Sequence, residues 1–189
     1  MTKNKKDDIM GAALVLFAER GYDGTTVPMI AEEAKVGAGT IYRYFENKET
    51  LVNALFQKYI QEFSETLKDE FPFESANIRE QFHHVFNKMI QFAKKNIHAL
   101  KFIDSHSNTH HLDEISNQMF EEFLAFLRDV LEDGKKQGII SPLPTEALIS
   151  IVYGAFSHLF KLIRIGVLEE TPELLVSVEE CCWNAIRVS

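Results

Sequence analysis

Apolar residues recur at intervals of three and four along most of the chain, the spacing that places them on one face of an α-helix. Between Lys5 and Arg20 this pattern is clear, and Gly21 follows at the position where a left-handed residue commonly ends a helix. Capping residues, first-turn prolines and terminal glycines mark the other boundaries. The predicted helices cover residues 5–20, 25–34, 38–45, 47–68, 77–93, 99–106, 113–137, 144–165 and 171–188. No segment has a convincing strand pattern, so we predict an all-α fold of about nine helices.

The first three predicted helices, over residues 5–45, have the pattern of a small separate domain. Two short helices joined by a brief glycine-containing turn, with aromatic and basic residues on the second, are typical of a DNA-binding helix-turn-helix. We therefore predict a DNA-binding domain at residues 1–47 and a larger helical domain at residues 48–189. On this pattern alone, a small helical subdomain that binds no DNA is an open alternative.

The segment from Phe17 to Leu51 carries a characteristic series of residues. The series comprises Phe17, Gly21, Thr25, Thr26, Ile30, Ala31, Ala34, Val36, Gly39, Thr40, Ile41, Tyr42, Phe45, Lys48 and Leu51. It closely resembles the tetracycline-repressor (TetR) family of bacterial regulators, whereas the rest of the chain matches only in length, helix count and the positions of Gly138 and Gly154. The resemblance implies a homodimer that binds double-stranded operator DNA and answers to a small-molecule effector. We expect a repressor; the alternative is a helical ligand-binding or protein-interaction module that binds no DNA.

Candidate phosphate contacts lie at the starts of the second and fourth predicted helices. Backbone amides at the start of the second helix, assisted by Thr25 or Thr26, form a site for a phosphate, and Lys48 forms another. The resemblance implies that Tyr42 and Tyr44 donate hydrogen bonds to further phosphates. Tyr44 lies near the apolar face of its helix, so a half-buried packing role is an open alternative for it.

Candidate base contacts lie on the third predicted helix. Thr40 and Arg43 can reach phosphates or base edges, although Arg43 is also placed for a solvated surface charge. Gly39 lacks a side chain and so permits a close approach to the groove. The chain departs from the family at Gly37 and Ala38, where serine and a longer polar residue are commoner. We therefore expect specificity to depend on Arg43, Thr40, methyl contacts from Ala38 and DNA shape.

The larger domain is rich in phenylalanine, which suggests an apolar ligand site as well as a core. The resemblance implies an effector cavity among the fifth to eighth helices. The candidate effector-binding residues are Phe86, Met89, Phe102, His106, Phe123 and Phe156. We expect a mainly apolar effector, with His106 and the following polar loop at the mouth of the cavity. For each aromatic residue, ordinary core packing is the alternative.

The last two predicted helices combine small residues with large apolar ones, which lets helices approach closely. We expect them to pair with their copies in a four-helix dimer interface. The candidate interface residues are Ile151, Gly154, Ala155, His158, Leu162, Val178 and Ile186. Packing of these two helices within one protomer only is the alternative.

Composition and charge agree with a globular DNA-binding chain. The 189 residues are 46% hydrophobic and 25% charged, with a formal net charge of −8. Residues 1–50 carry seven basic and eight acidic side chains, so most of the negative charge lies downstream of the predicted DNA-binding face. Lys3, Lys5 and Lys6 form a basic arm that either enters a minor groove or adds electrostatic attraction.

Several function classes find no support in the sequence. The two cysteines, Cys181 and Cys182, are adjacent, which suits neither a disulfide framework nor a zinc site, and the histidines near residues 106–111 lie in a predicted loop. We therefore expect no metal and no cofactor. No apolar run reaches the roughly 18 residues needed to span a bilayer, and no signal sequence is evident, so we expect a cytoplasmic protein without a membrane partner. No nucleophile, base and orienting group form a coherent set, which argues against an enzyme.

Overall fold

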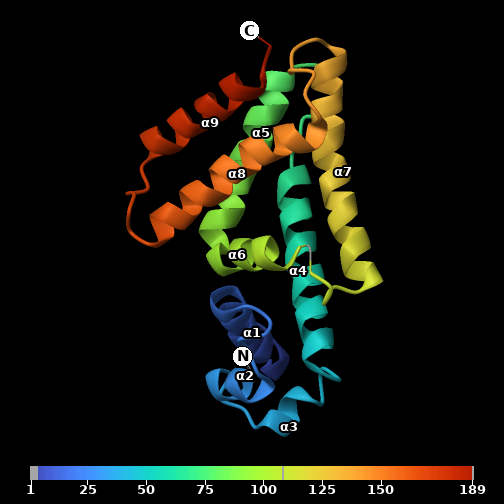
Figure 1. Ribbon diagram of the computed structural model, residues 1–189, viewed down its shortest axis with the longest axis vertical. Helices are drawn as coiled ribbons and strands as arrows, with labels where there is room; N and C mark the ends of the chain where they lie inside the picture. Colours follow the sequence, from blue (N-terminus) through green and yellow to red (C-terminus); the bar gives the residue numbers. More distant parts are fainter. Residues whose placement is uncertain (1–3, 108, 189) are drawn as a thin grey trace. The chain divides into compact units, whose positions relative to one another are not determined.

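The structure is a computed structural model that describes residues 4–107 and 109–188. Over these residues it contains nine α-helices, and its β-structure is limited to one isolated bridge between Ile140 and Arg187. The helices are α1 (Lys5–Arg20), α2 (Val27–Glu33), α3 (Ala38–Ile41), α4 (Lys48–Lys68), α5 (Ile78–Lys95), α6 (Ile97–His106), α7 (Glu114–Lys136), α8 (Thr145–Arg164) and α9 (Pro172–Ile186) (Figure 1). The predicted all-α fold is confirmed.

The third helix is shorter than the sequence predicts. The prediction of a helix over residues 38–45 is wrong beyond Ile41, where α3 ends after one turn. The Arg43 N–H bonds to the Thr40 carbonyl at 3.3 Å, and the Tyr44 N–H to the Ile41 carbonyl at 2.9 Å. These bonds reach back three residues instead of four, so the chain tightens into a turn at residues 42–44.

The helix starts use the side-chain caps that the sequence predicts, with one difference. The Thr26 hydroxyl accepts a hydrogen bond from the Met29 N–H at 3.4 Å and begins α2. At the start of α5, Asn77 accepts from the Glu80 N–H at 3.3 Å, but the Glu80 carboxylate accepts from the Ser75 hydroxyl at 2.7 Å. Only one half of the expected capping box is therefore present.

The chain folds into two compact units, each with its own core. The first comprises the chain up to Ser64 together with Lys94–Glu121: α1, α2, α3, most of α4, α6 and the start of α7. In this unit α1 packs against α2 and α6. Phe17 of α1 and Phe102 of α6 are both fully buried, with ring centres 6.2 Å apart. Because α6 completes this core, the unit extends beyond residues 1–47; the domain boundary at 47 stays a prediction.

The second unit comprises Glu65–Ala93 and the chain from Glu122 onward: most of α5 and α7, with α8 and α9. Figure 1 shows α8 and α9 joined by a short connection, and the two helices pack against each other. Phe86 of α5 and Phe156 of α8 are buried and meet edge to face at 6.0 Å. These contacts make an apolar core for the unit.

Gly134 lies inside α7, which continues through it to Lys136. A Cβ at this position would lie 2.4 Å from Ile140 Cγ1 and 3.0 Å from Ile78 Cγ2. The missing side chain therefore admits Ile140 against the helix, so close packing explains a glycine that weakens the helix locally.

One helix bears on the expectation about membranes. Thr145–Arg164 is long and apolar enough to cross a bilayer by length and composition, although its apolar residues are interrupted by small and polar ones. Only 22% of its most apolar stretch is buried within the structure. Length and composition do not distinguish a membrane span from an apolar helix that pairs with another protein surface.

Candidate DNA-binding surface and ligand pocket

The two helices of the candidate DNA-binding surface rest on a buried apolar scaffold. The scaffold residues are Val27, Ile30, Ala31, Ile41 and Phe45, all of which are buried. The turn between α2 and α3 contains Lys35 at a φ of 55°, and its N–H bonds to the Glu32 carbonyl. The Val36 N–H bonds to the Ala31 carbonyl at 2.9 Å, so the end of α2 forms a Schellman-type cap with lysine in place of glycine.

The turn that follows α3 presents the most exposed aromatic side chains of the surface. Tyr42 is 55% exposed and Tyr44 is 43% exposed, with the exposed Arg43 between them. This exposure favours the contact role of Tyr44 over half-burial. Thr40 is half-buried on α3. Phenol, guanidinium and hydroxyl groups on one short segment are suited to phosphate oxygens and base edges.

The front of α3 is bare of polar side chains. Ala38 and Gly39 are exposed, and so is the preceding Gly37. A Cβ at Gly37 or Gly39 would meet nothing within 4 Å. No packing within the chain requires glycine at these two positions, which leaves main-chain atoms open to a partner.

The two threonines before α2 have different roles. Thr25 is fully buried, and its hydroxyl donates to the Gly21 carbonyl at 2.8 Å and lies 3.1 Å from the Leu16 carbonyl. The prediction that its side chain assists a phosphate site is therefore wrong, because the hydroxyl is enclosed by the α1–α2 connection. Thr26 is exposed and caps α2, so the phosphate prediction stays with Thr26.

Lys48 points into the protein. Its ammonium group donates to the carbonyls of Tyr22 at 2.9 Å and Thr25 at 3.0 Å. The side chain is half-buried. The two hydrogen bonds use two of the three N–H donors of the ammonium group. A phosphate contact by Lys48 stays a prediction.

A buried amide that the sequence analysis missed joins α4 to the start of α7. Asn53 is 4% exposed, and its amide group donates to the carbonyls of His111 at 2.8 Å and Glu49 at 2.9 Å. Its oxygen accepts from the Asp113 N–H at 2.8 Å and the Ser116 hydroxyl at 2.7 Å. All four hydrogen-bonding positions of the amide are used, and only tertiary structure brings His111, Asp113 and Ser116 to Asn53.

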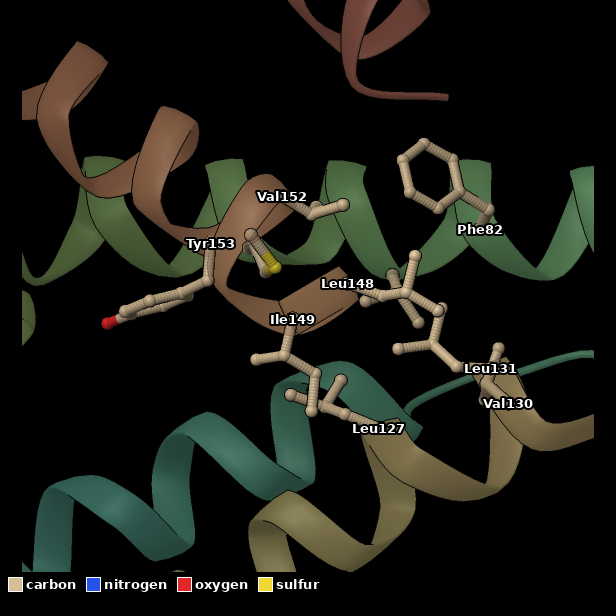
Figure 2. A pocket seen from close by; sticks show the side chains of 10 residues that line it. Phe82, Leu127, Val130, Leu131, Leu148, Ile149, Val152 and Tyr153 are labelled. Atoms are coloured by element: carbon tan, nitrogen blue, oxygen red, sulfur yellow. The ribbon is translucent and has the colours of Figure 1, made fainter. Parts of the chain in front are cut away.

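An apolar pocket lies in the second unit among α5, α7 and α8 (Figure 2). Its lining consists of Phe82, Val85, Met89, Leu127, Val130, Leu131, Leu148, Ile149, Val152 and Tyr153. The cavity measures about 50 Å³. Figure 2 shows side chains from all three helices converging, with the Tyr153 hydroxyl directed away from the other labelled residues. Such a lining suits an apolar group and offers few hydrogen bonds.

The structure does not gather the predicted effector-binding residues in this pocket. Met89 lines it, whereas Phe86, Phe123 and Phe156 are buried elsewhere in the unit's core. Their contribution to an effector site stays a prediction.

Phe102 and His106 belong to the core of the first unit. The His106 ring packs against both Phe17 and Phe102 and is 1% exposed, so its predicted place at the mouth of a cavity is wrong. Its Nδ1 lies 2.9 Å from the Phe102 carbonyl, and its Nε2 is buried without a hydrogen-bond partner. Burial lowers the pKa of His106, which favours the neutral imidazole.

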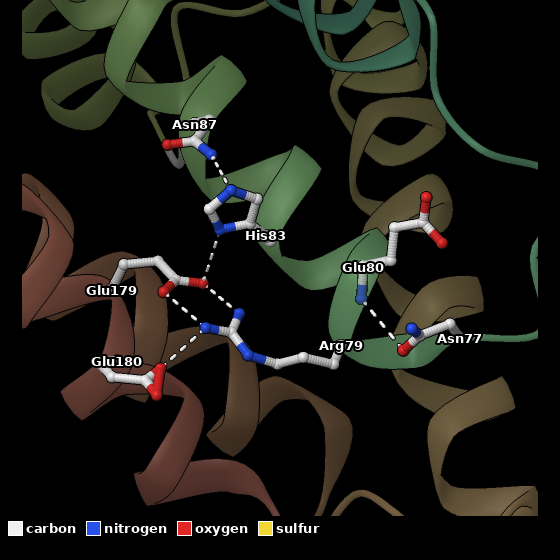
Figure 3. A network of polar contacts seen from close by, with 7 residues as sticks. All are labelled: Asn77, Arg79, Glu80, His83, Asn87, Glu179 and Glu180. Carbon is white, nitrogen blue, oxygen red and sulfur yellow. Dashed lines mark hydrogen bonds and ion pairs between the residues drawn. The ribbon is translucent and has the colours of Figure 1, made fainter.

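A polar network holds α9 against α5 (Figure 3). The buried Glu179 carboxylate accepts both guanidinium nitrogens of Arg79, and His83 lies 3.4 Å from it. The Arg79 side chain also donates to Glu180 at 2.8 Å and lies 5.2 Å from the ring centre of Trp183. These contacts position the two helices, and the hydrogen bonds that Arg79 donates to Glu179 raise the pKa of Arg79.

The candidate dimer residues divide between surface and core. Ile151, Gly154, Ala155 and His158 are exposed on α8, whereas Leu162 and Val178 are half-buried.

Ile186 is fully buried, so its predicted place in a dimer interface is wrong. One residue corresponds to about 100° around a helix, and the preceding Ala185 lies on the exposed side with Cys181. Among residues 4–107 and 109–188, no group of three or more potential ligands is arranged to hold a metal ion.

Two family models together match nearly all of the chain. Residues 9–55 match the family described as "Bacterial regulatory proteins, tetR family". Residues 56–188 match "Tetracyclin repressor-like, C-terminal domain".

Two relatives from Bacillus subtilis match over most of their length. The uncharacterised HTH-type transcriptional regulator YhgD is 30% identical over 148 residues, which cover 77% of each chain. The fatty acid metabolism regulator protein is 29% identical over 134 residues, which cover 70% of this chain and 69% of that one.

Solved structures share the fold. A TetR family transcription regulator from Marinobacter aquaeolei VT8 superposes with a TM-score of 0.85 at 22% identity, covering 98% of this chain and 96% of that one. The transcriptional regulator FadR from Bacillus subtilis, in complex with stearoyl-CoA, superposes with a TM-score of 0.67 at 23% identity, covering 94% and 95%.

Proposed function

This chain belongs to the TetR family of bacterial transcriptional regulators, and we propose that it is a cytoplasmic, homodimeric repressor whose effector carries a long apolar chain. The observation that carries the DNA-binding part is the exposed turn Tyr42-Arg43-Tyr44 on the buried scaffold of α2 and α3. The tyrosines and Thr26 contact phosphates, and Arg43 reads a base edge. The bare edge at Ala38 and Gly39 lies against the major groove.

The effector binds the apolar pocket of the second unit. Two observations support an acyl chain: the lining is apolar, and relatives include a fatty acid metabolism regulator and a FadR solved with stearoyl-CoA. The cavity of about 50 Å³ is too small for such a chain, so binding must spread α5, α7 and α8. The effector then favours the conformation with the open pocket, which holds the operator less well.

The dimer forms through the exposed faces of α8 and α9. Ile151, Ala155 and His158 recur along one face of α8, and Cys181 and Ala185 along one face of α9. Pairing with a second copy covers this surface and accounts for the low burial of the apolar α8. A two-fold dimer presents two recognition elements at a separation that matches successive major grooves, roughly 34–36 Å in related assemblies.

Selection of duplexes from a randomised library by the purified chain tests the DNA-binding part. We expect enrichment of a two-fold symmetric site that is bound at about 10⁻⁸ M or tighter. Arg43→Ala is expected to weaken binding and to relax the preference at one base position. Recovery of no preferred duplex would overturn the proposal.

Stearoyl-CoA, coenzyme A alone and stearate, each added to the protein–DNA complex, test the effector. We expect stearoyl-CoA or stearate to release the duplex, and coenzyme A alone to leave it bound. Val152→Trp fills the pocket, so this variant is expected to keep DNA binding and lose the response. Release by coenzyme A alone, or an unchanged response in Val152→Trp, would contradict an apolar-chain effector at this site.

Sedimentation or light scattering tests the dimer. Ala155→Glu places a charge in the proposed interface and is expected to give monomers that bind the duplex weakly. Val176→Glu is the matched control, because Val176 is 65% exposed on the opposite side of α9 from Cys181 and Ala185. A monomeric parent protein, or equal effects of the two substitutions, would argue against this interface.

A further inference from the structure

The turn between α1 and α2 is held by a column of three side chains from separate parts of the first unit. Tyr22 lies in this turn, Lys48 begins α4, and His111 lies in the connection between α6 and α7. The Lys48 ammonium lies over the Tyr22 ring, 3.8 Å from its centre. The His111 ring stacks on the same ring at 3.7 Å with an interplanar angle of 21°. The ammonium group and the imidazole ring are both too close to the centre of the Tyr22 ring to share one of its faces, so they lie on opposite faces.

Each end of the column is fixed by main-chain hydrogen bonds. Lys48 binds the carbonyls of Tyr22 and Thr25, and Thr25 directly precedes Thr26, the cap of α2. At the other end, the His111 carbonyl accepts from the buried Asn53 amide at 2.8 Å. The start of α2 is therefore tied, through Lys48 and the Tyr22 ring, to a segment that lies 58 residues beyond Asn53 in sequence.

We propose that His111 is a positioning residue for DNA binding: through its stack on Tyr22, and with Lys48 on the opposite face of that ring, it fixes the start of α2 without contacting DNA. This inference rests on the proposed function, because it assigns a role in operator binding. It also changes the interpretation of Lys48, which acts by holding the α1–α2 turn and does not neutralise a phosphate.

The physical reason lies in the geometry of the turn. Tyr22 is half-buried, and Lys48 alone covers only one face of its ring. Without the imidazole, the Tyr22 ring still has Lys48 and the parallel Phe17 ring, 6.0 Å away, beside it, but it can shift toward the vacated side and loosen the Lys48 ammonium from both carbonyls. The Thr26 cap and the amides at the start of α2 then lose the fixed position that a phosphate contact requires. Operator affinity falls, while the number of phosphate contacts in the bound state stays the same.

Salt dependence separates a positioning residue from a phosphate contact. A residue that neutralises a phosphate contributes about 0.9 to the slope of log K against log salt, whereas a positioning residue changes the intercept alone. We would measure the affinity of the wild-type chain, His111→Ala, His111→Phe and Lys48→Met for the selected duplex across a salt series. His110→Ala is the matched control, because His110 is the adjacent, exposed imidazole; its ring is tilted by 47° against the His111 ring and takes no part in the contacts with Tyr22 described above. Circular dichroism and thermal unfolding establish that each variant is folded.

We expect His111→Ala to weaken binding up to about tenfold, which corresponds to about 1.4 kcal/mol, with an unchanged slope, because one face of the Tyr22 ring loses its stacking partner. His111→Phe keeps a stacking ring and is expected to restore affinity to within about twofold. Lys48→Met is expected to weaken binding, again with the wild-type slope. His110→Ala is expected to bind like the wild type.

Three results would overturn the inference. A folded His111→Ala that binds like the wild type removes the positioning role, and the proposed function stands. A slope reduced by about 0.9 in His111→Ala or Lys48→Met identifies a phosphate contact instead. A wild-type chain that selects no duplex removes both the proposed function and the inference.

Discussion

The two units hold their candidate sites in different ways. In the first unit, buried or half-buried polar side chains bond to main-chain groups: Thr25 to Gly21, Lys48 to Tyr22, and Asn53 to two carbonyls and an N–H. In the second unit the pocket has an apolar lining, and the buried Glu179 and Lys88 form ion pairs with Arg79 and Asp69, none of which lines the pocket. Directional contacts thus position the DNA-binding surface, and non-directional contacts form the pocket.

This difference suits the two partners. A hydrogen bond weakens steeply with angle, so a buried network permits one arrangement of the segments that it joins. A fixed arrangement is what a periodic phosphate backbone requires. Apolar side chains can repack at small cost when total volume is conserved, which lets a pocket admit a flexible chain. Stability measurements on single variants can test this contrast.

The largest effect is expected for Asn53→Ala in the first unit. The substitution leaves four hydrogen-bonding groups without their partner in a buried place, so we expect a loss of about 3 kcal/mol. Urea unfolding at one fixed protein concentration measures it. Gln57→Ala is the control, because this half-buried neighbour on α4 touches the same network only at Ser116 and Asp113. A loss below that of Gln57→Ala would break the contrast between the units.

A smaller effect is expected for Gly134→Ala in the second unit. The added methyl would overlap Ile140, so we expect a loss of about 2 kcal/mol by the same unfolding measurement. Gly11→Ala in α1 is the matched control, because a Cβ there meets nothing within 4 Å and the change is expected to stabilise the helix by up to about 1 kcal/mol. If Gly134→Ala is tolerated as well as Gly11→Ala, the second unit repacks even at its tightest contact.

The smallest effect is expected at two residues of left-handed backbone, one in each unit. Lys35 and Glu70 both have a φ of 55°, a conformation that glycine adopts more readily. We expect Lys35→Gly and Glu70→Gly each to stabilise the chain by about 0.5–1 kcal/mol and to act additively. Lys35→Ala and Glu70→Ala are the controls, because alanine also has a Cβ and keeps the energetic cost of a positive φ. A loss of stability in either glycine variant would show that the side chain contributes more than its backbone conformation costs.

The sequence predicts helices well where their ends depend on local chemistry. The start of α2 at the Thr26 cap and the end of α1 before Gly21 follow from side-chain caps and backbone preference. The early end of α3 was not predictable in this way. It depends on hydrogen bonds from the N–H groups of Arg43 and Tyr44 to carbonyls three residues earlier, in a segment whose Phe45 side chain is buried.

The candidate sites were only partly predictable, because the missing information is three-dimensional. Thr25 and Thr26 look alike in sequence, yet Thr26 caps α2 and Thr25 is buried in the α1–α2 connection. Phe102 has the composition of a pocket residue, and only packing places it in the first unit beside Phe17. Ile186 was predicted to lie at the surface, but the exposed residue is the preceding Ala185, which lies about 100° away around the helix. His111 carries no local signal, because its partner Tyr22 lies far away in sequence.

The brevity of α3 has a consequence for any attempt to transplant its recognition properties. A single helical turn has no stability of its own in water, since nucleation costs more than one turn returns. A synthetic peptide of these residues would be unstructured, and a graft onto another scaffold would fail unless α1, α2 and the beginning of α4 came with it. The smallest transferable DNA-binding element of this molecule therefore contains several helices. Its evolution toward new operators must preserve the supporting helices while a few exposed residues vary.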